Sequence, residues 1–149
     1  MQAVFFTEIE SVIAQYFEGR PCRVVPFAYP FEFATLAASG SGLAIQRVQS
    51  NANFLLMSVE SMVSAGSFND ITIQITDTGS QEKFFETPVP VTSNCGTVDS
   101  QAGLNTHNLA FPRLIAGNST IQVDLAAGAA GAATTPAILL VGVHVYVYG

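Results

Sequence analysis

Apolar and polar residues alternate through most of this chain, and this period of two restricts its fold more than any other feature. In residues 71–76 isoleucine occupies every odd position and threonine or glutamine every even one, and residues 121–125 repeat the pattern. Successive side chains of a β-strand point to opposite faces, so such runs predict strands with one buried face. Glycine, asparagine, aspartate and serine separate the runs, as turns require. The chain is therefore predicted to be all-β.

The predicted architecture is an antiparallel β-sandwich of jelly-roll type, because short strands recur without the crossover helices that a parallel sheet needs. The last run extends from about Ile138 to Tyr148. One of its faces, predicted to line the core between the sheets, carries Leu139, Val141, Val143, Val145 and Val147. Its other face, predicted to meet another subunit, carries Leu140, His144, Tyr146 and Tyr148.

Two local patterns lead to more specific predictions. A Ser-Gly-Ser-Gly sequence at residues 39–42 separates Phe33 from Leu43, and we predict it to be the turn of a hairpin. Between residues 86 and 111, prolines, glycines and asparagines leave too little alternation for more than short edge strands. In the strand before them, four apolar residues are predicted to share one face: Leu55, Met57, Val59 and Val63.

The N-terminal residues follow a different period. Apolar residues in 7–17 fall at i, i+3, i+4, i+7 and i+8, which predicts a short amphipathic helix. Pro21, Pro26 and Pro30 then interrupt an extended stretch. Because proline lacks a backbone donor, residues 20–30 are predicted to be an arm rather than a central strand. The predicted division is a helix and extended arm at 1–30, followed by a β-sandwich domain at 31–149.

Charge is scarce and acidic. The chain has 5 Lys and Arg against 11 Asp and Glu, a net charge of -6, and charged residues make up 11% of it, against about 25% in ordinary soluble domains. Binding to nucleic acid needs clustered cations, so nucleic acid is excluded as an expected partner. A surface with so few charges has little to repel a neighbour, which favours association with other proteins.

No residue set in the sequence predicts catalysis or a bound metal. His107 and His144 are the only histidines and have no carboxylate at ligand spacing, and Cys22 and Cys95 form no zinc or redox motif. We expect both cysteines to be thiols, with a single disulfide as the alternative. No serine lies in a nucleophile elbow. The expectation is a protein that is not an enzyme and has no cofactor.

A membrane partner is not expected either. Residues 126–133 are only Ala and Gly, and the apolar run after Pro136 alternates like a strand and is shorter than the ~20 residues that a spanning helix needs. The first residues lack the basic region of a secretory signal. We therefore expect synthesis and assembly in the cytoplasm.

Three stretches of the chain resemble small virion structural proteins of tailed bacteriophages. They are Pro26-Phe27-Ala28-Tyr29 through Asn53-Phe54-Leu55-Leu56, then residues 68–75, then residues 111–125 with the strand that contains Gly142-Val143-His144-Val145-Tyr146. The resemblance covers roughly residues 26–149. It implies a compact β-sandwich that serves the particle as a decoration, cement or connector subunit. It brings no catalytic residue with it.

The predicted function is that of a phage virion structural protein, most simply a decoration or cement subunit that binds the capsid lattice and stabilises the particle. The alternatives are a head-tail connector, a tail or baseplate component, or a glycan-binding host-attachment module. Expected partners are copies of the chain, as a homotrimer, and the major capsid protein or another virion protein. The residues predicted to form interfaces are Phe5, Phe6, Tyr16, Phe27, Tyr29, His144, Tyr146 and Tyr148.

Overall fold

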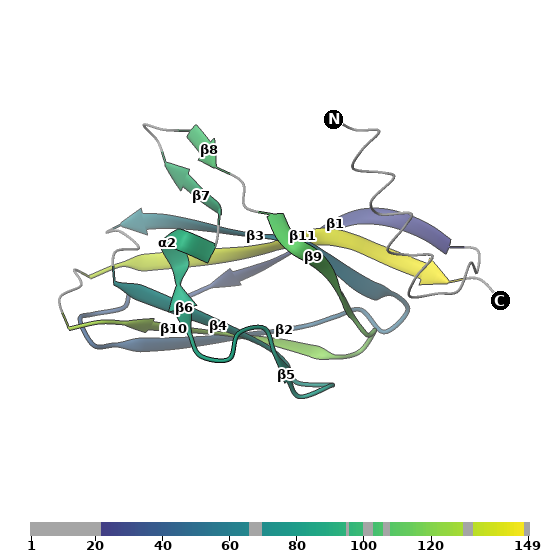
Figure 1. Ribbon diagram of the computed structural model, residues 1–149, viewed down its shortest axis with the longest axis horizontal. Helices are drawn as coiled ribbons and strands as arrows, with labels where there is room; N and C mark the ends of the chain where they lie inside the picture. The colour runs from purple at the N-terminus through teal and green to yellow at the C-terminus, as the bar shows by residue number, and fades with distance from the viewer. Residues whose placement is uncertain are drawn as a thin grey trace.

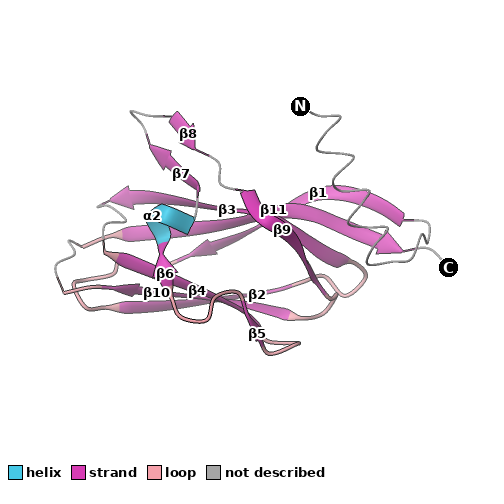
Figure 2. Cartoon of the chain, viewed as in Figure 1, coloured by secondary structure: helices cyan, strands magenta, loops and turns pink. Residues whose placement is uncertain are grey.

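Two β-sheets packed face to face make up the described part of the protein, which confirms the predicted all-β sandwich (Figures 1 and 2). The computed structural model describes residues 22–65, 70–94, 96–99, 103–105, 108–129 and 133–147. The helix predicted at residues 7–17 lies outside these ranges, as do Cys95 and His107. Within them, one short helical turn accompanies the strands (Figure 2).

The elements follow one another along the chain with short connections. They are β1 (Cys22–Glu32), β2 (Ser41–Arg47), β3 (Asn53–Ala65), β4 (Ile71–Asp77), β5 (Glu82–Lys83), β6 (Val89–Pro90), the turn α2 (Val91–Asn94), β7 (Gly96–Asp99), β8 (Gly103–Asn105), β9 (Asn108–Ile115), β10 (Thr120–Ala127) and β11 (Thr135–Val147).

The order in which the strands pair is that of a jelly roll. The first sheet has the order β1-β11-β3, with β9 and the β7-β8 pair on the other side of β3. The second sheet has the order β2-β10-β4, with β5 and β6 beyond β4. The pairs are antiparallel, apart from the parallel contact of β3 with β7. Successive strands β1 to β4 alternate between the sheets, so the first and last strands become neighbours, as in double-sheet jelly rolls.

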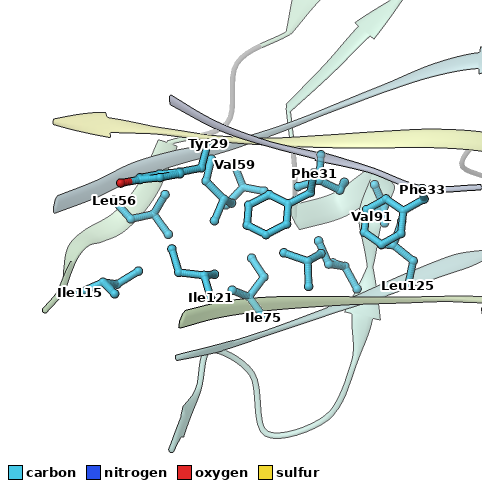
Figure 3. Close-up of a cluster of buried hydrophobic side chains, with 14 of the residues drawn as sticks. Tyr29, Phe31, Phe33, Leu56, Val59, Ile75, Val91, Ile115, Ile121 and Leu125 are labelled. Atoms are coloured by element: carbon cyan, nitrogen blue, oxygen red, sulfur yellow. The ribbon is translucent and has the colours of Figure 1, made fainter. Parts of the chain in front are cut away.

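The hydrophobic core fills the space between the two sheets (Figure 3). The alternation of apolar and polar residues produces this core. In β10, for example, Ile121, Val123 and Leu125 are buried while the residues between them are half-buried. The second sheet contributes these three with Ile71, Ile73 and Ile75, and the first sheet contributes Tyr29, Phe31, Phe54, Leu56, Val59, Ile138 and Leu140. The strands predicted at residues 71–76 and 121–125 are confirmed.

The last strand presents the opposite face to the core from the one predicted. Ile138 and Leu140 face the second sheet, whereas Val143 and Val145 belong to another buried cluster, with Leu55 and Met57, on the outer face of the first sheet. Alternation defines two faces of a strand but does not say which of them meets the other sheet. The prediction that the valine row lines the inter-sheet core is therefore wrong.

A β-bulge part-way along β3 changes which residues of this strand face the core. The pairing of β3 with β9 shifts register between Leu56 and Ser58, and the pairing with β11 shifts between Val141 and Gly142. The extra residue reverses the alternation, because a bulge places two residues opposite one. Leu55 and Met57 lie on the outer face, while Val59 lies in the main core. The prediction that these three residues share one face is therefore wrong.

The hairpin predicted around residues 39–42 does not form. Phe33 follows β1, which pairs with β11, whereas Leu43 lies in β2, which pairs with β10. The chain between them crosses from one sheet to the other, held by backbone hydrogen bonds between Leu36 and Thr134 in both directions. The segment does connect two strands, but those strands lie in different sheets.

The extended stretch predicted at residues 20–30 is, from Cys22 onward, the edge strand β1. It pairs with β11 over its whole length, from Cys22 opposite Val147 to Glu32 opposite Ala137. Pro26 and Pro30 fit an edge strand because the missing donor faces away from the ladder. Residues 22–30 therefore form part of the first sheet, and the sandwich begins before residue 31.

Within the described ranges, no helix is long and apolar enough to cross a membrane.

Candidate binding surface

Aromatic side chains gather on the inner face of the first sheet, near the start of β1 and the end of β11. The register places Arg23 opposite Tyr146, Val25 opposite His144 and Phe27 opposite Gly142. This end of β1 and β11 extends past the strands of the second sheet (Figure 1). Arg23 is exposed, Phe27 is 36% exposed and Tyr146 is half-buried. We call Phe27, Tyr29, Phe54, His144 and Tyr146 the aromatic cluster.

A hydrogen-bonded network holds the buried part of the aromatic cluster. The Tyr29 hydroxyl lies 2.7 Å from His144 Nε2, and the backbone N–H of Gln49 donates to the same hydroxyl at 3.2 Å. Tyr29 is 5% exposed and His144 is 1% exposed. With the Tyr29 oxygen accepting from Gln49, donation of the Tyr29 O–H to His144 Nε2 would satisfy both side chains with the imidazole neutral.

Ring contacts extend this network to the surface. Phe27 stacks on the His144 ring, with centroids 4.1 Å apart and planes inclined by 23°. From the core side, the Phe54 ring packs at nearly right angles to the rings of Tyr29 and His144, with centroid distances of 4.8 and 5.9 Å. The Arg23 guanidinium lies 4.6 Å from the centre of the Tyr146 ring. Phe27 has room over His144 because its opposite residue on β11 is Gly142, which has no side chain.

Burial sets the protonation of the two hydrogen-bonded members, Tyr29 and His144. It lowers the pKa of the His144 imidazole below its usual 6.5, because a charged ring loses its hydration there. Burial also raises the pKa of the Tyr29 hydroxyl, and the Gln49 hydrogen bond opposes that rise. Both groups are therefore neutral near pH 7. A neutral, satisfied pair inside the sheet fixes the positions of the rings above it, which is a property of a rigid contact surface.

Acidification is expected to destabilise the protein through His144. With its folded pKa below 6.5, the unfolded chain binds a proton that the folded chain refuses, so this contribution to stability is complete above pH 6.5 and declines as the pH falls toward the folded pKa. The melting temperature, measured from pH 7.5 to 5, should decrease as the pH falls below 6.5.

The variant His144→Gln, which keeps a polar group near the Tyr29 hydroxyl, should flatten this pH dependence. Equal pH profiles for the wild type and His144→Gln would contradict the assignment.

The structure brings four of the predicted interface residues into one cluster. Phe27 and Tyr146 reach the surface, whereas Tyr29 and His144 are buried beneath them. The other four, Phe5, Phe6, Tyr16 and Tyr148, lie outside the described residues. That these residues contact another subunit stays a prediction. Sequence reasoning missed Phe54 and Gln49 as partners of the cluster, because neither alternation nor spacing indicates which distant residues meet.

A groove of about 260 Å³ lies on the outer face of the second sheet. Its walls include Leu43, Thr72, Gln74, Pro88 and Asp124. Gln74 is held by the backbone of Phe85, donating to its oxygen at 2.7 Å and accepting from its N–H at 3.2 Å. The lining therefore combines a carboxylate and hydroxyl groups with apolar side chains.

Among the described residues, no three His, Cys, Asp or Glu side chains converge as a metal site would require. No protein-family model matches the sequence, and no curated protein matches it. Among solved structures, the chain is similar to dimeric latent PorU from Porphyromonas gingivalis, with 11% identity and a TM-score of 0.36. That match covers 81% of this chain and 13% of the PorU chain. At this level of likeness it gives no indication of function.

Proposed function

We propose that this protein is a non-enzymatic structural subunit of a tailed-phage particle, a decoration or cement protein that binds the capsid lattice and copies of itself. The observation that carries the proposal is the aromatic cluster. Residues from opposite ends of the chain, Phe27 on β1 and Tyr146 on β11, form one partly exposed aromatic surface over a buried, hydrogen-bonded base. Tyrosine and phenylalanine are enriched in the cores of protein interfaces.

The physical properties of this surface suit docking to a protein. Its anchors are held by the sheet and by ring stacking, so little side-chain freedom is lost on binding. Aromatic rings bury large areas, and tyrosine keeps a polar tip that can donate a hydrogen bond. Jelly rolls also occur among viral capsid proteins, but they occur in lectins and cupins as well, so the fold supports the proposal only by analogy.

Particle binding tests the proposal directly. Purified protein is added to particles of the encoding phage that lack it, and the bound fraction is measured by co-sedimentation. The double variant Phe27→Ala/Tyr146→Ala should raise the Kd about 30-fold, because hot-spot side chains contribute about 2 kcal/mol or more.

The matched control is Met62→Ala, which removes an apolar side chain that is 51% exposed on β3, away from the aromatic cluster. Its Kd should equal that of the wild type. Saturation of the particles by the double variant at wild-type concentrations would exclude the aromatic cluster as the docking surface. Failure of the wild-type protein to bind particles, together with retention on a glycan array, would replace this function with the glycan-binding alternative.

A further inference from the structure

We propose that β2 pairs with β2 of a second copy of this chain, joining the second sheets of two molecules into one continuous sheet. This inference specifies the self-contact within the proposed function and rests on it only for the expectation that copies associate. It involves a different sheet from the aromatic cluster. The argument starts from the edges of the sandwich and how each is protected.

Among the described strands, β2 is an edge with little of the usual protection. Sheet edges present unpaired backbone groups, and proteins shield them with proline, charges, bulges or short strands. The edge strand β1 contains Pro26 and Pro30, and the side chain of Gln46 donates to the Pro30 oxygen at 2.8 Å. At the far edge of the second sheet, β5 and β6 have two residues each. In contrast, β2 has seven residues, lacks proline, and pairs with β10 without a register shift.

The hydrogen-bond pattern shows which groups of β2 face outward along the edge. Ala127 donates its N–H to the Gly40 oxygen at 2.8 Å, and Val48 donates to the Ser119 oxygen at 2.9 Å. Both bonds continue the register of β2 with β10, so the even-numbered residues of β2 bond to β10. Antiparallel pairs alternate, so the odd-numbered residues direct their N–H and C=O groups away from β10. These residues are Ser41, Leu43, Ile45 and Arg47.

The same odd-numbered residues carry the exposed side chains. Leu43 is 57% exposed and Ile45 is 55% exposed, an apolar pair at the centre of the strand. A two-fold axis through Ala44 would place Leu43 of each copy opposite Ile45 of the other and would pair all seven residues. Only odd-numbered residues then exchange hydrogen bonds across the axis, as the open backbone groups require. The apolar pairs would shield each other from water.

Charge favours a second copy as the occupant. Each chain has a net charge of -6, so the contact between copies must avoid placing carboxylates together. The only charged residue of β2 is Arg47, and β2 has no acidic residue. In the pairing about Ala44, Arg47 lies opposite Ser41 of the other copy. The next pair along the same face is Ile45 with Leu43 of the other copy, and that Leu43 lies beside Asp124 of its own β10. The symmetry produces this approach of cation and carboxylate twice.

The oligomeric state of the purified protein, without particles, tests the pairing. Sedimentation over a concentration series should show a dimer, where the sequence favoured a trimer. Leu43→Lys and Ile45→Lys should each raise the dimer Kd at least 10-fold, because lysine on an edge opposes strand pairing. Met62→Lys, at a similarly exposed apolar side chain on β3, should leave the dimer intact.

A charge exchange tests the register. Arg47→Asp and Asp124→Arg should each weaken the dimer, and the double variant Arg47→Asp/Asp124→Arg should recover it, which a merely structural effect of either substitution would not produce. Far-UV circular dichroism checks that each variant is folded. A monomer at all concentrations, a trimer, or equal dissociation by Met62→Lys would overturn the pairing. Because particle binding is measured separately, either result leaves the docking surface to its own test.

Discussion

Truncation of Phe54 to alanine should lower the free energy of unfolding by about 4 kcal/mol. Phe54 is fully buried in β3, and its ring meets Tyr29 and His144 edge-on. The substitution removes the ring from the core and leaves a cavity between the sheet and the hydrogen-bonded pair. Chemical denaturation of the purified variant measures the loss.

Phe27→Ala is the matched control, because it removes the same ring from the same aromatic cluster at a position that is 36% exposed. Its loss should be about 1 kcal/mol or less, since the ring already contacts water and leaves no closed cavity. Comparable losses for the two variants would mean that Phe54 does not connect the aromatic cluster to the core as described.

Replacement of Gly142 by valine is the second large effect, with an expected loss of about 3 kcal/mol. Gly142 lies within β11, between Phe27 of β1 and Leu56 of β3. A Cβ atom there would overlap the Leu55 carbonyl oxygen and lie 3.1 Å from the Leu56 Cα. Those atoms belong to the backbone of a central strand at a bulge, so they cannot move aside as a side chain does. The melting temperature should fall by about 10 °C.

Gly42→Ala provides the comparison for this prediction. A Cβ at Gly42 would lie 3.1 and 3.2 Å from side-chain carbons of Phe33 and Leu36, which can shift by a few tenths of an ångström. We expect a loss of about 1 kcal/mol or less there. A stable Gly142→Val protein with an unchanged melting temperature would show that β11 and β3 do not approach as closely as the bulge implies.

Much of the fold could be predicted because burial of one strand face leaves a mark in the sequence. The alternation in β4 and β10 predicted both strands, and a glycine and an asparagine that precede β10, Gly117 and Asn118, form a turn, with Asn118 at a φ of 68°. Likewise Asp77, the last residue of β4, accepts from the N–H of Gly79 in the following turn at 2.9 Å. These features depend on residues close in sequence, so local patterns are sufficient to find them.

The candidate site was predicted only as a set of residue types. Aromatic residues on β1 and β11 suggested interfaces, but the network joins Tyr29 to His144 across 115 positions of sequence. Nothing in the spacing of Tyr29 indicates that partner, nor the backbone N–H of Gln49. Likewise, the exposed edge of β2 follows from which strands pair, and the alternation of β2 alone is compatible with a hairpin that does not form.

The sequence by itself determined that this chain is an all-β sandwich with few charges, because period-two alternation and composition act residue by residue. Only the tertiary structure decided which face of each strand meets the core, where the bulge in β3 reverses that face, and which strands form the edges. Those outcomes depend on pairing between distant segments. A strand has two faces and two edges of nearly equal local preference, and the choice between them is made by the neighbours it packs against.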